Sequence, residues 1–258
     1  MSYSTITLSI ENDIAVLALN RPDVKNAMSS KMRAEILHAV KEAQTQARVL
    51  VLTGNGDAFC SGQDLGGEEA VGGMDPERIL REEYEPMLNA IFDSAIPTIS
   101  AVNGVAAGAG ASLALAADVV VATQSAVFLQ AFTRIGLLPD AGGTYFLPRQ
   151  MGLAKAMGTA LFAEPVSASQ ASEWGMIWEA VPDEKFATHW QARASHLASG
   201  PTQAYRRVKT AMRASQDNDL STQLALEAKF QGECAATQDF AEGVQAFMEK
   251  RRAQFQGQ

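Results

Sequence analysis

One carboxylate in this sequence has surroundings that suit acid–base chemistry. Asp140 stands in the segment GLLPDAGGT, after apolar residues and before a double glycine. Burial among apolar side chains disfavours the charged form of a carboxylic acid and raises its pKa toward neutral pH, where the acid can take up and return protons. An aspartate just before a helix is also a common N-cap, and the segment alone leaves both interpretations open. The apolar residues expected to exclude water here are Phe132, Ile135, Leu137 and Leu138.

The stretch 103–118, NGVAAGAGASLALAAD, could supply a second part of such a site. It follows an apolar run at 96–102 that has the length of a buried strand, and Gly108 and Gly110 then open a run of small residues typical of a tightly packed helix. A strand, a glycine turn and a helix expose unpaired main-chain N–H groups at the turn, which can bind an anion or an oxyanion. In the alternative interpretation, the glycines only let a helix pack closely on a sheet.

The common nucleotide and nucleophile motifs are missing from this stretch. Gly108-x-Gly110 is followed by Ala111, Ser112 and Leu113, so the third glycine of the dinucleotide fingerprint is absent. The chain has no Gly-Lys-Ser/Thr phosphate loop, and Ser112 stands in GASLA rather than in a G-x-S-x-G elbow. The chemistry must therefore be identified from other segments.

Composition narrows the function classes. The chain has 258 residues, of which 47% are apolar and 19% charged, as in an ordinary globular protein with one domain and an appendage. A net charge of −8 argues against nucleic acid as a partner. The first residues lack the cationic segment of a secretory signal peptide, and no apolar run is long enough to span a membrane. We therefore expect a cytoplasmic protein without a membrane partner. Cys60 and Cys234 are too few for a disulfide framework, and the three histidines lack metal-ligand spacing, so we expect no metal. We also expect no cofactor.

The elements that would position these residues alternate between strands and helices. Two strands at 5–10 and 14–19 should form a hairpin, and a helix capped by Ser29 or Ser30 should cover 32–46. An unbroken apolar strand at 49–53 should be buried on both faces. The remaining expected elements are a turn-rich loop at 54–65, a mobile glycine-rich segment from Gly66 to Asp75, a helix over 76–93, strands at 119–122, 127–129 and 177–181, a helix at 155–162 and a short helix at 169–174 capped by Ser167.

The chain from residue 183 onward reads as helical, with helices at 183–199, 201–215, 220–234 and 236–253. Apolar residues recur at helical spacing on these segments: Phe240, Val244 and Phe247 on the last helix, and Tyr205, Val208 and Met212 on the second. Such stripes usually belong to a core, and on a long helical tail they also suggest subunit contacts.

Four segments, in this order and spacing, resemble the crotonase, or enoyl-CoA hydratase/isomerase, superfamily: NRPDVKNA at 20–27, FCSGQDL at 59–65, the stretch 103–118 and GLLPDAGGTYFLPRQMG at 136–152. The resemblance covers essentially the whole chain. It implies an α/β fold, a crotonase-like spiral of ββα units, with a core at 1–198 that holds the active site and a C-terminal helical trimerisation region at 199–258 that also closes the pocket. The partners it implies are an acyl-CoA thioester, with coenzyme A as part of the substrate, and further copies of the chain in a homotrimer or dimer of trimers.

The resemblance also assigns roles by position. The thioester oxyanion would be held by the backbone N–H groups of Gln63 and Ala109, which stabilise the negative charge that forms when a proton is removed next to the carbonyl. Residues expected to bind coenzyme A or substrate are Lys25, Ala27, Ser61, Asp64, Leu65, Gly108, Phe132 and Lys250, with Arg21, Arg251 and Arg252 as further cations for the phosphates. Asp64 could instead only anchor its turn, and each cation could be ordinary surface charge.

The acids depart from the pattern of the hydratases in this superfamily. Those enzymes resemble one another in using two glutamates to hold and split water, and the matching positions here are Ser112 and Phe132. Asp140 is the carboxylate left in register, so it becomes the predicted catalytic acid of an isomerase. Three segments, NGVAAGAGA, GLLPDAGGT and SEWGMIW, look most like the branch that isomerises ring-1,2-epoxyphenylacetyl-CoA to oxepin-CoA in phenylacetate catabolism, with a shift of an acyl-CoA double bond from C3 to C2 as a second activity. The alternatives are an enoyl-CoA hydratase, a thioester hydrolase and a non-catalytic acyl-CoA-binding subunit.

Overall fold

The computed structural model describes residues 3–66 and 75–258, and its elements follow the predicted alternation of strands and helices. Apart from its two end residues, the segment Gly66 to Asp75 that the sequence predicts to be mobile lies outside the described residues. None of the helices in the described ranges is long and apolar enough to cross a membrane.

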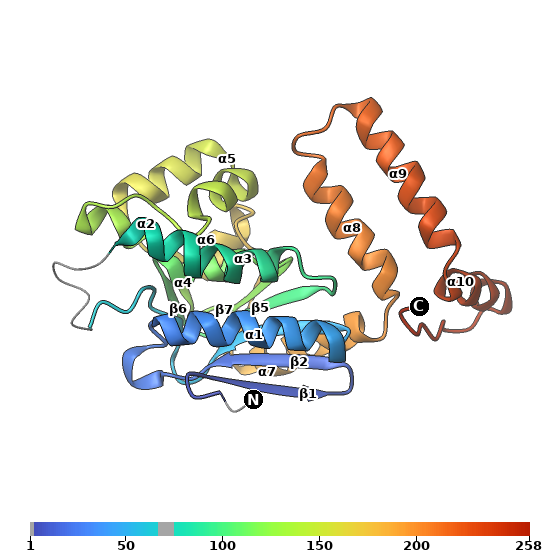
Figure 1. Cartoon of the computed structure of the whole chain (residues 1–258), viewed down its shortest axis with the longest axis horizontal. Helices are drawn as coiled ribbons and strands as arrows, with labels where there is room; N and C mark the ends of the chain where they lie inside the picture. The colour runs from blue at the N-terminus through green and yellow to red at the C-terminus, as the bar shows by residue number, and fades with distance from the viewer. Residues whose placement is uncertain (1–2, 67–74) are drawn as a thin grey trace.

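The larger sheet has the strand order β1-β2-β3-β5-β7-β10 (Figure 1). The predicted hairpin is confirmed as β1 (Ile6–Glu11) and β2 (Ile14–Leu19), which pair antiparallel. The other neighbours pair parallel, and the strands are β3 (Val49–Gly54), β5 (Thr98–Val102), β7 (Val119–Thr123) and β10 (Glu179–Val181). The predicted strand at 177–181 is thus shorter at its start.

The smaller sheet has the order β4-β6-β8-β9. Its strands are β4 (Ala58–Cys60), β6 (Val105–Ala107), β8 (Val127–Leu129) and β9 (Val166–Ser167), and the first three run parallel. In each of the consecutive pairs β3/β4, β5/β6 and β7/β8, the first strand belongs to the larger sheet and the second to the smaller one. This arrangement produces the repeating units that the resemblance predicts. The sequence analysis did not predict β4, β6 or β9. Strands β4 and β6 lie within segments rich in turn-forming and small residues, and β9 has only two residues.

Helices cover both faces of the larger sheet. Helix α1 (Ser30–Gln46) begins where Ser29 accepts a hydrogen bond from the Met32 N–H, as predicted. In β3, Leu50 and Leu52 belong to the core cluster on the α1 side. Val49 and Val51 belong to a second cluster with α7 (Asp183–Ala198). The predicted burial of β3 on both faces is therefore confirmed.

The helix predicted over 76–93 is present in three parts, α2 (Pro76–Ile79), the π-helical turn η3 (Leu80–Tyr84) and α3 (Glu85–Phe92). Pro86 lacks an N–H, and its ring would collide with the Glu82 carbonyl in a regular α-helix. The wider π turn lies at this point and removes the conflict. It also brings Leu80 and Tyr84 to the cavity described below.

Helix α5 (Gly143–Phe162) is longer than the predicted helix at 155–162, and it is interrupted at Gly152, which has a φ of +76°. The short helix α6 (Ala168–Glu173) begins with the predicted cap, because Ser167 accepts from the Gln170 N–H. The other short elements are η1 (Pro22–Val24), α4 (Ala109–Leu115) and η4 (Ala131–Ile135).

Helices α8 (Thr202–Ala214), α9 (Leu220–Ala235) and α10 (Gln238–Glu249) lie to one side of the two sheets (Figure 1). Helix α8 is bonded to the larger sheet's end through Lys209, which donates to the Ile96 carbonyl at 3.0 Å and pairs with Asp118 at 2.8 Å. The predicted helix at 236–253 ends early because Lys250 takes the left-handed conformation at a φ of +53°. The interpretation of the apolar stripe on α10 as core is wrong within this chain, since Phe240, Val244 and Phe247 are 51%, 41% and 84% exposed. The arrangement leaves these side chains available for contacts with another chain.

Candidate active site

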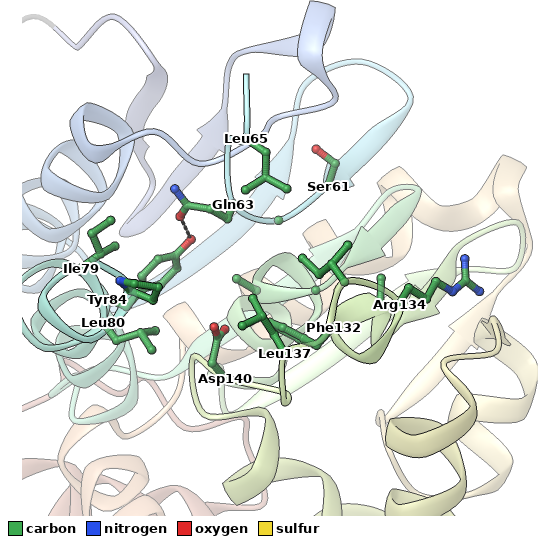
Figure 2. A pocket seen from close by; sticks show the side chains of 16 residues that line it. Ser61, Gln63, Leu65, Ile79, Leu80, Tyr84, Phe132, Arg134, Leu137 and Asp140 are labelled. Carbon is green, nitrogen blue, oxygen red and sulfur yellow. Dashed lines mark hydrogen bonds between the residues drawn. The ribbon is translucent and has the colours of Figure 1, made fainter. Parts of the chain in front are cut away.

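A cavity of about 310 Å³ lies at the carboxyl ends of β4, β6 and β8 (Figure 2). Parallel strands end at the same edge of a sheet, so the segments that follow them meet there. The segment after β4 contributes Ser61, Gly62 and Gln63, the segment after β6 contributes Gly108 and Ala109, and the segment after β8 contributes Phe132. The other lining residues are Leu65, Pro76, Ile79, Leu80, Tyr84, Ala131, Arg134, Ile135, Leu137 and Asp140.

The main chain at Gln63, a residue that lines the cavity, is fixed by a bridge to Met28. Met28 and Gln63 form a parallel bridge in which the Met28 N–H donates to the Gly62 carbonyl at 2.8 Å and the Asp64 N–H donates to the Met28 carbonyl at 3.1 Å. Successive N–H groups of an extended chain point to opposite sides, so the Gln63 N–H points away from Met28. Among the residues that the structure describes, none accepts a hydrogen bond from it.

The Ala109 N–H lies beside this loop at the first position of α4. A Cβ built on Gly62 would stand 3.5 Å from the Ala109 nitrogen, which shows how closely the two segments approach. The two glycines of the predicted turn have different roles. Gly108 has a φ of +53° and aims the turn, whereas a Cβ on Gly110 would lie 2.4 Å from the Cys60 carbonyl oxygen. The close-packing interpretation is therefore confirmed at Gly110, and the anion-site interpretation stays a prediction.

Asp140 is the one carboxylate among the described residues that line the cavity. Its Oδ1 is buried and has no hydrogen-bond partner in the described parts of the chain. Burial raises the pKa of this carboxyl to about 6. A carboxylic acid with this pKa exists in both protonation states near neutral pH, which is the condition for accepting and returning a proton within one turnover.

The interpretation of Asp140 as a helix cap is wrong. The N-cap of α5 is Gly142, and no side chain caps that helix end. Instead the main-chain carbonyl of Asp140 accepts from the Gly143 N–H at 2.8 Å and from the Ser112 hydroxyl at 2.9 Å. These bonds hold the backbone and leave the carboxyl group free of the helix end.

The walls near Asp140 are apolar. Phe132 is 7% exposed, whereas Ile135 and Leu137 also line the cavity but remain 61% and 46% exposed. Leu138 is 68% exposed and lies outside the lining, so the expectation that it excludes water does not hold in the single chain.

The remaining predicted ligand-binding residues lie around the rim or elsewhere. Lys25 and Ala27 do not line the cavity, although the Ser61 N–H donates to the Lys25 carbonyl at 2.9 Å and so places this segment beside it. Asp64 binds Arg21 at 2.7 Å and accepts from the Gly66 N–H at 3.0 Å, which anchors its turn. Lys250 lies at the end of α10, outside the lining residues.

The predicted phosphate-binding cations are partly engaged within the chain. Arg251 pairs with Glu242 and Glu249, each at 2.6 Å, and Arg21 pairs with Asp64. Arg134 lines the cavity without having been predicted, but its guanidinium donates to the Ala163 carbonyl and points away from Asp140 (Figure 2).

The sequence analysis missed two polar side chains at the cavity. Tyr84 lines it from η3, and Arg33 of α1 donates to the Gln63 side chain behind it. Tyr84 follows Leu80 at i, i+4 spacing, which signals only a buried helix face. Within the described ranges, no group of three or more His, Cys, Asp and Glu side chains could hold a metal ion.

Comparisons with known proteins agree with this geometry. The sequence profile described as Enoyl-CoA hydratase/isomerase matches residues 9–258. A "probable enoyl-CoA hydratase" of Rhodobacter capsulatus is 58% identical over 257 residues, covering 100% of each chain. The 1,2-epoxyphenylacetyl-CoA isomerase of Escherichia coli is 44% identical over 257 residues, covering 96% of this chain and 97% of the relative. A crystal structure of enoyl-CoA hydratase from Bacillus anthracis has a TM-score of 0.91 at 31% identity, covering 99% of this chain and 100% of that one, which confirms the predicted fold.

Proposed function

Because the chain belongs to the enoyl-CoA hydratase/isomerase family, whose fold is the crotonase spiral, we propose that it is an acyl-CoA isomerase that uses Asp140 as its single proton-transferring acid. The observation that carries this proposal is the state of Asp140, a carboxyl with a pKa of about 6 whose buried Oδ1 has no hydrogen-bond partner among the residues that the structure describes. A single acid of this kind suits isomerisation, because the proton removed from one carbon is returned to another and nothing else is consumed.

The proposed reaction begins with an acyl-CoA whose thioester oxygen accepts hydrogen bonds from the Gln63 and Ala109 N–H groups. Asp140 removes a proton from the carbon next to the carbonyl, and the negative charge moves to the thioester oxygen, where the two donors stabilise it. The protonated acid then delivers the proton to a more distant carbon, which completes a double-bond shift with no net gain or loss of atoms. The apolar wall around Phe132 keeps water from competing for the intermediate.

For the substrate we propose ring-1,2-epoxyphenylacetyl-CoA, converted to oxepin-CoA in phenylacetate catabolism. In this conversion the carbon–carbon bond shared by the epoxide and the six-membered ring breaks as the ring double bonds rearrange, and the proton shift by Asp140 completes an isomerisation with no change in atoms or oxidation state. A C3-to-C2 double-bond shift in enoyl-CoAs is the second reaction that we propose. The similarity to the isomerase of Escherichia coli supports this choice. A mostly apolar cavity with aromatic side chains at Tyr84 and Phe132 is also compatible with a cyclic acyl group.

Hydration of an enoyl-CoA is the second candidate, because the relative at 58% identity is named for it. The side chains at the site argue against it. Ser112 is fully buried and its hydroxyl is bonded to the Asp140 carbonyl, and Phe132 carries no ionisable group. The cavity therefore lacks a second acid, within the described residues, to hold and split a water molecule.

We also propose assembly into a homotrimer or a dimer of trimers through 199–258. The exposed apolar side chains of α10, Phe240, Val244 and Phe247, support contacts of this kind. Measurement of the molar mass in solution tests the oligomeric state directly.

The reaction is tested by incubating the protein with epoxyphenylacetyl-CoA, with a 3-enoyl-CoA and with crotonyl-CoA, and by identifying products from mass and ultraviolet absorbance. The proposal expects products of unchanged mass from the first two substrates and little hydrated product from the third. Hydration of crotonyl-CoA as the dominant activity would favour the second candidate.

The Ala109→Pro variant tests the oxyanion donor, since proline is tolerated at the first position of a helix but lacks the N–H. Turnover should fall by about 100-fold or more while acyl-CoA binding partly persists.

A further inference from the structure

Three segments that are distant in the sequence meet at the amide side chain of Gln63. Its Oε1 accepts a hydrogen bond from Arg33 Nη1 of α1 at 2.8 Å. It accepts another from the Tyr84 hydroxyl of η3 at 2.7 Å (Figure 2). Both lone pairs of the amide oxygen are thereby occupied. The side chain is therefore fixed at its tip, and it belongs to the same residue as the main-chain N–H assigned to the oxyanion.

The Arg33 guanidinium is a rigid part of this arrangement. Arg33 is 1% exposed, and it also donates to the Met28 carbonyl at 2.8 Å and pairs with Glu83 at 2.7 Å. Met28 is the residue that bridges to Gln63, so Arg33 connects both sides of that bridge. A buried guanidinium whose donors are satisfied by fixed acceptors has little freedom to move, because losing any acceptor would leave a buried charge poorly solvated.

Tyr84 joins this group from the opposite wall of the cavity. It is 3% exposed, its ring centroid lies 4.7 Å from the Arg33 guanidinium carbon, and it lines the cavity with Asp140. Burial raises the pKa of the phenol, so the hydroxyl keeps its proton at working pH and acts as the donor to Gln63. A phenol that lines a site but directs its hydroxyl at a loop side chain is suited to holding that loop.

The loop needs such support. Gly62 has a φ of +101°, so the turn before Gln63 uses a conformation that side chains rarely adopt. On one edge the loop is fixed by the Met28 bridge. The Gln63 side chain adds two contacts outside the loop, through Oε1 with Arg33 and Tyr84, while its Nε2 donates to the Asp64 carbonyl within the loop at 3.3 Å. A small rotation of the Gln63 peptide would turn its N–H away from the thioester oxygen, and catalysis is sensitive to displacements of this kind.

We propose that Tyr84 is a positioning residue which, together with Arg33, fixes the Gln63 side chain and through it the direction of the Gln63 N–H. The inference rests on the proposed oxyanion function of that N–H and adds a residue to it. Tyr84 acts on the polarisation of the thioester, not on proton transfer, which Asp140 performs. Loss of its hydroxyl should therefore lower kcat with little change in KM.

The test uses Tyr84→Phe, Gln63→Ala and the double variant, with Tyr205→Phe as a matched control. Tyr205 lies in α8 outside the cavity lining, so its loss of a hydroxyl should change nothing at the site. Bound cinnamoyl-CoA reports the oxyanion contact directly, because polarisation of its carbonyl shifts its absorbance to longer wavelength. Steady-state kinetics supply kcat and KM for the same proteins, and thermal melts show which of them are folded.

Tyr84→Phe should lower kcat by about 10-fold, keep KM within about twofold and reduce the absorbance shift of bound cinnamoyl-CoA. In the Gln63→Ala background the same change should have almost no further effect, because the hydroxyl then has no partner to hold. Gln63→Ala alone tests the same connection should Tyr84→Phe fail to fold, and it should show the same reduced shift.

Two results would overturn the inference. One is an unchanged absorbance shift of cinnamoyl-CoA bound to folded Tyr84→Phe. The other is a double variant in which the fold-losses of kcat from the two single substitutions multiply, as independent effects would. Neither result would overturn the oxyanion function itself, provided that the unsubstituted protein shifts the absorbance of bound cinnamoyl-CoA. Absence of a shift in the unsubstituted protein would instead remove the proposed oxyanion site, and the inference with it.

Discussion

The hydroxyl of Ser112 on α4 donates a 2.9 Å hydrogen bond to the main-chain carbonyl of Asp140. The bond joins the helix that begins with one proposed oxyanion donor to the segment that carries the proposed acid. Ala141, the next residue, holds a left-handed conformation at a φ of +49°, which costs a residue with a Cβ about 1 kcal/mol. Specific contacts therefore hold the backbone around Asp140 in a conformation that the residue after it would not prefer. Such a conformation is expected where a side chain must keep one position.

Replacement of Ser112 by alanine should loosen this connection. We expect the free energy of unfolding to fall by about 1 kcal/mol and kcat to fall by about 10-fold, since a buried carbonyl loses a donor and the acid gains freedom. Denaturant unfolding and steady-state kinetics measure the two effects. Ser199→Ala is the matched control, because the Ser199 hydroxyl bonds the His196 carbonyl at an exposed helix end. Equal effects of the two substitutions would contradict the role of Ser112.

The rate should depend on pH through Asp140. As the base, Asp140 must be ionised in the free enzyme, so kcat/KM should rise with pH through an apparent pKa of about 6 and then level off. The profile is measured with the isomerised substrate at constant ionic strength. A profile that stays flat through this range would show that another group limits the reaction.

Stability should also depend on pH through the same group. The pKa of Asp140 in the folded state is raised to about 6 from the ordinary 3.8. Above pH 6 the ionised carboxylate therefore destabilises the fold, and this penalty disappears as pH falls below 3.8, where the group is protonated in both the folded and the unfolded state. Asp140→Asn should therefore stabilise the protein at neutral pH by about 1 to 2 kcal/mol, after discounting for partial solvent access. The gain should shrink steadily as unfolding is measured at lower pH. A gain independent of pH would mean that charge burial is not its cause.

Close packing of α4 on β4 should be required for the oxyanion geometry. A Cβ on Gly110 would lie 2.4 Å from the Cys60 carbonyl oxygen and 2.7 Å from the Cys60 Cβ, so Gly110→Ala must displace the helix. We expect a loss of about 2 kcal/mol or more in stability together with lost turnover. In the control Gly158→Ala, where a Cβ meets nothing within 4 Å inside α5, helix propensity should give a small gain of up to about 1 kcal/mol. Tolerance of alanine at Gly110 would contradict the packing described.

Long periodic segments were predictable from the sequence. The hairpin of β1 and β2, the Ser29 cap of α1 and the burial of β3 on both faces follow from local patterns that the tertiary structure does not override. The first half of α5 was not predicted, because Gly142, Gly143 and Pro148 are residues that normally mark loops. The missed strands β4 and β6 become strands only by pairing in the smaller sheet.

The apolar surroundings of Asp140 were sufficient to predict a raised pKa, which the structure gives. Nothing in the local sequence marks Arg33 or Tyr84. A charged residue on an amphipathic helix usually faces water, and a tyrosine on the apolar face of another usually only fills space. Their convergence on Gln63 depends on contacts between residues 30 positions apart, from Arg33 to Gln63, and 21 positions apart, from Tyr84 to Gln63. Only the three-dimensional structure contains that information.

The account depends most on Asp140 as the group that carries the proton, and turnover by the Asp140→Asn variant tests it directly. Asparagine keeps the volume and removes the base, so isomerisation of epoxyphenylacetyl-CoA or a 3-enoyl-CoA, followed by absorbance and mass, should fall by about 1,000-fold while acyl-CoA binding is retained. A folded variant that isomerises either substrate at close to the rate of the unsubstituted protein would contradict the central claim.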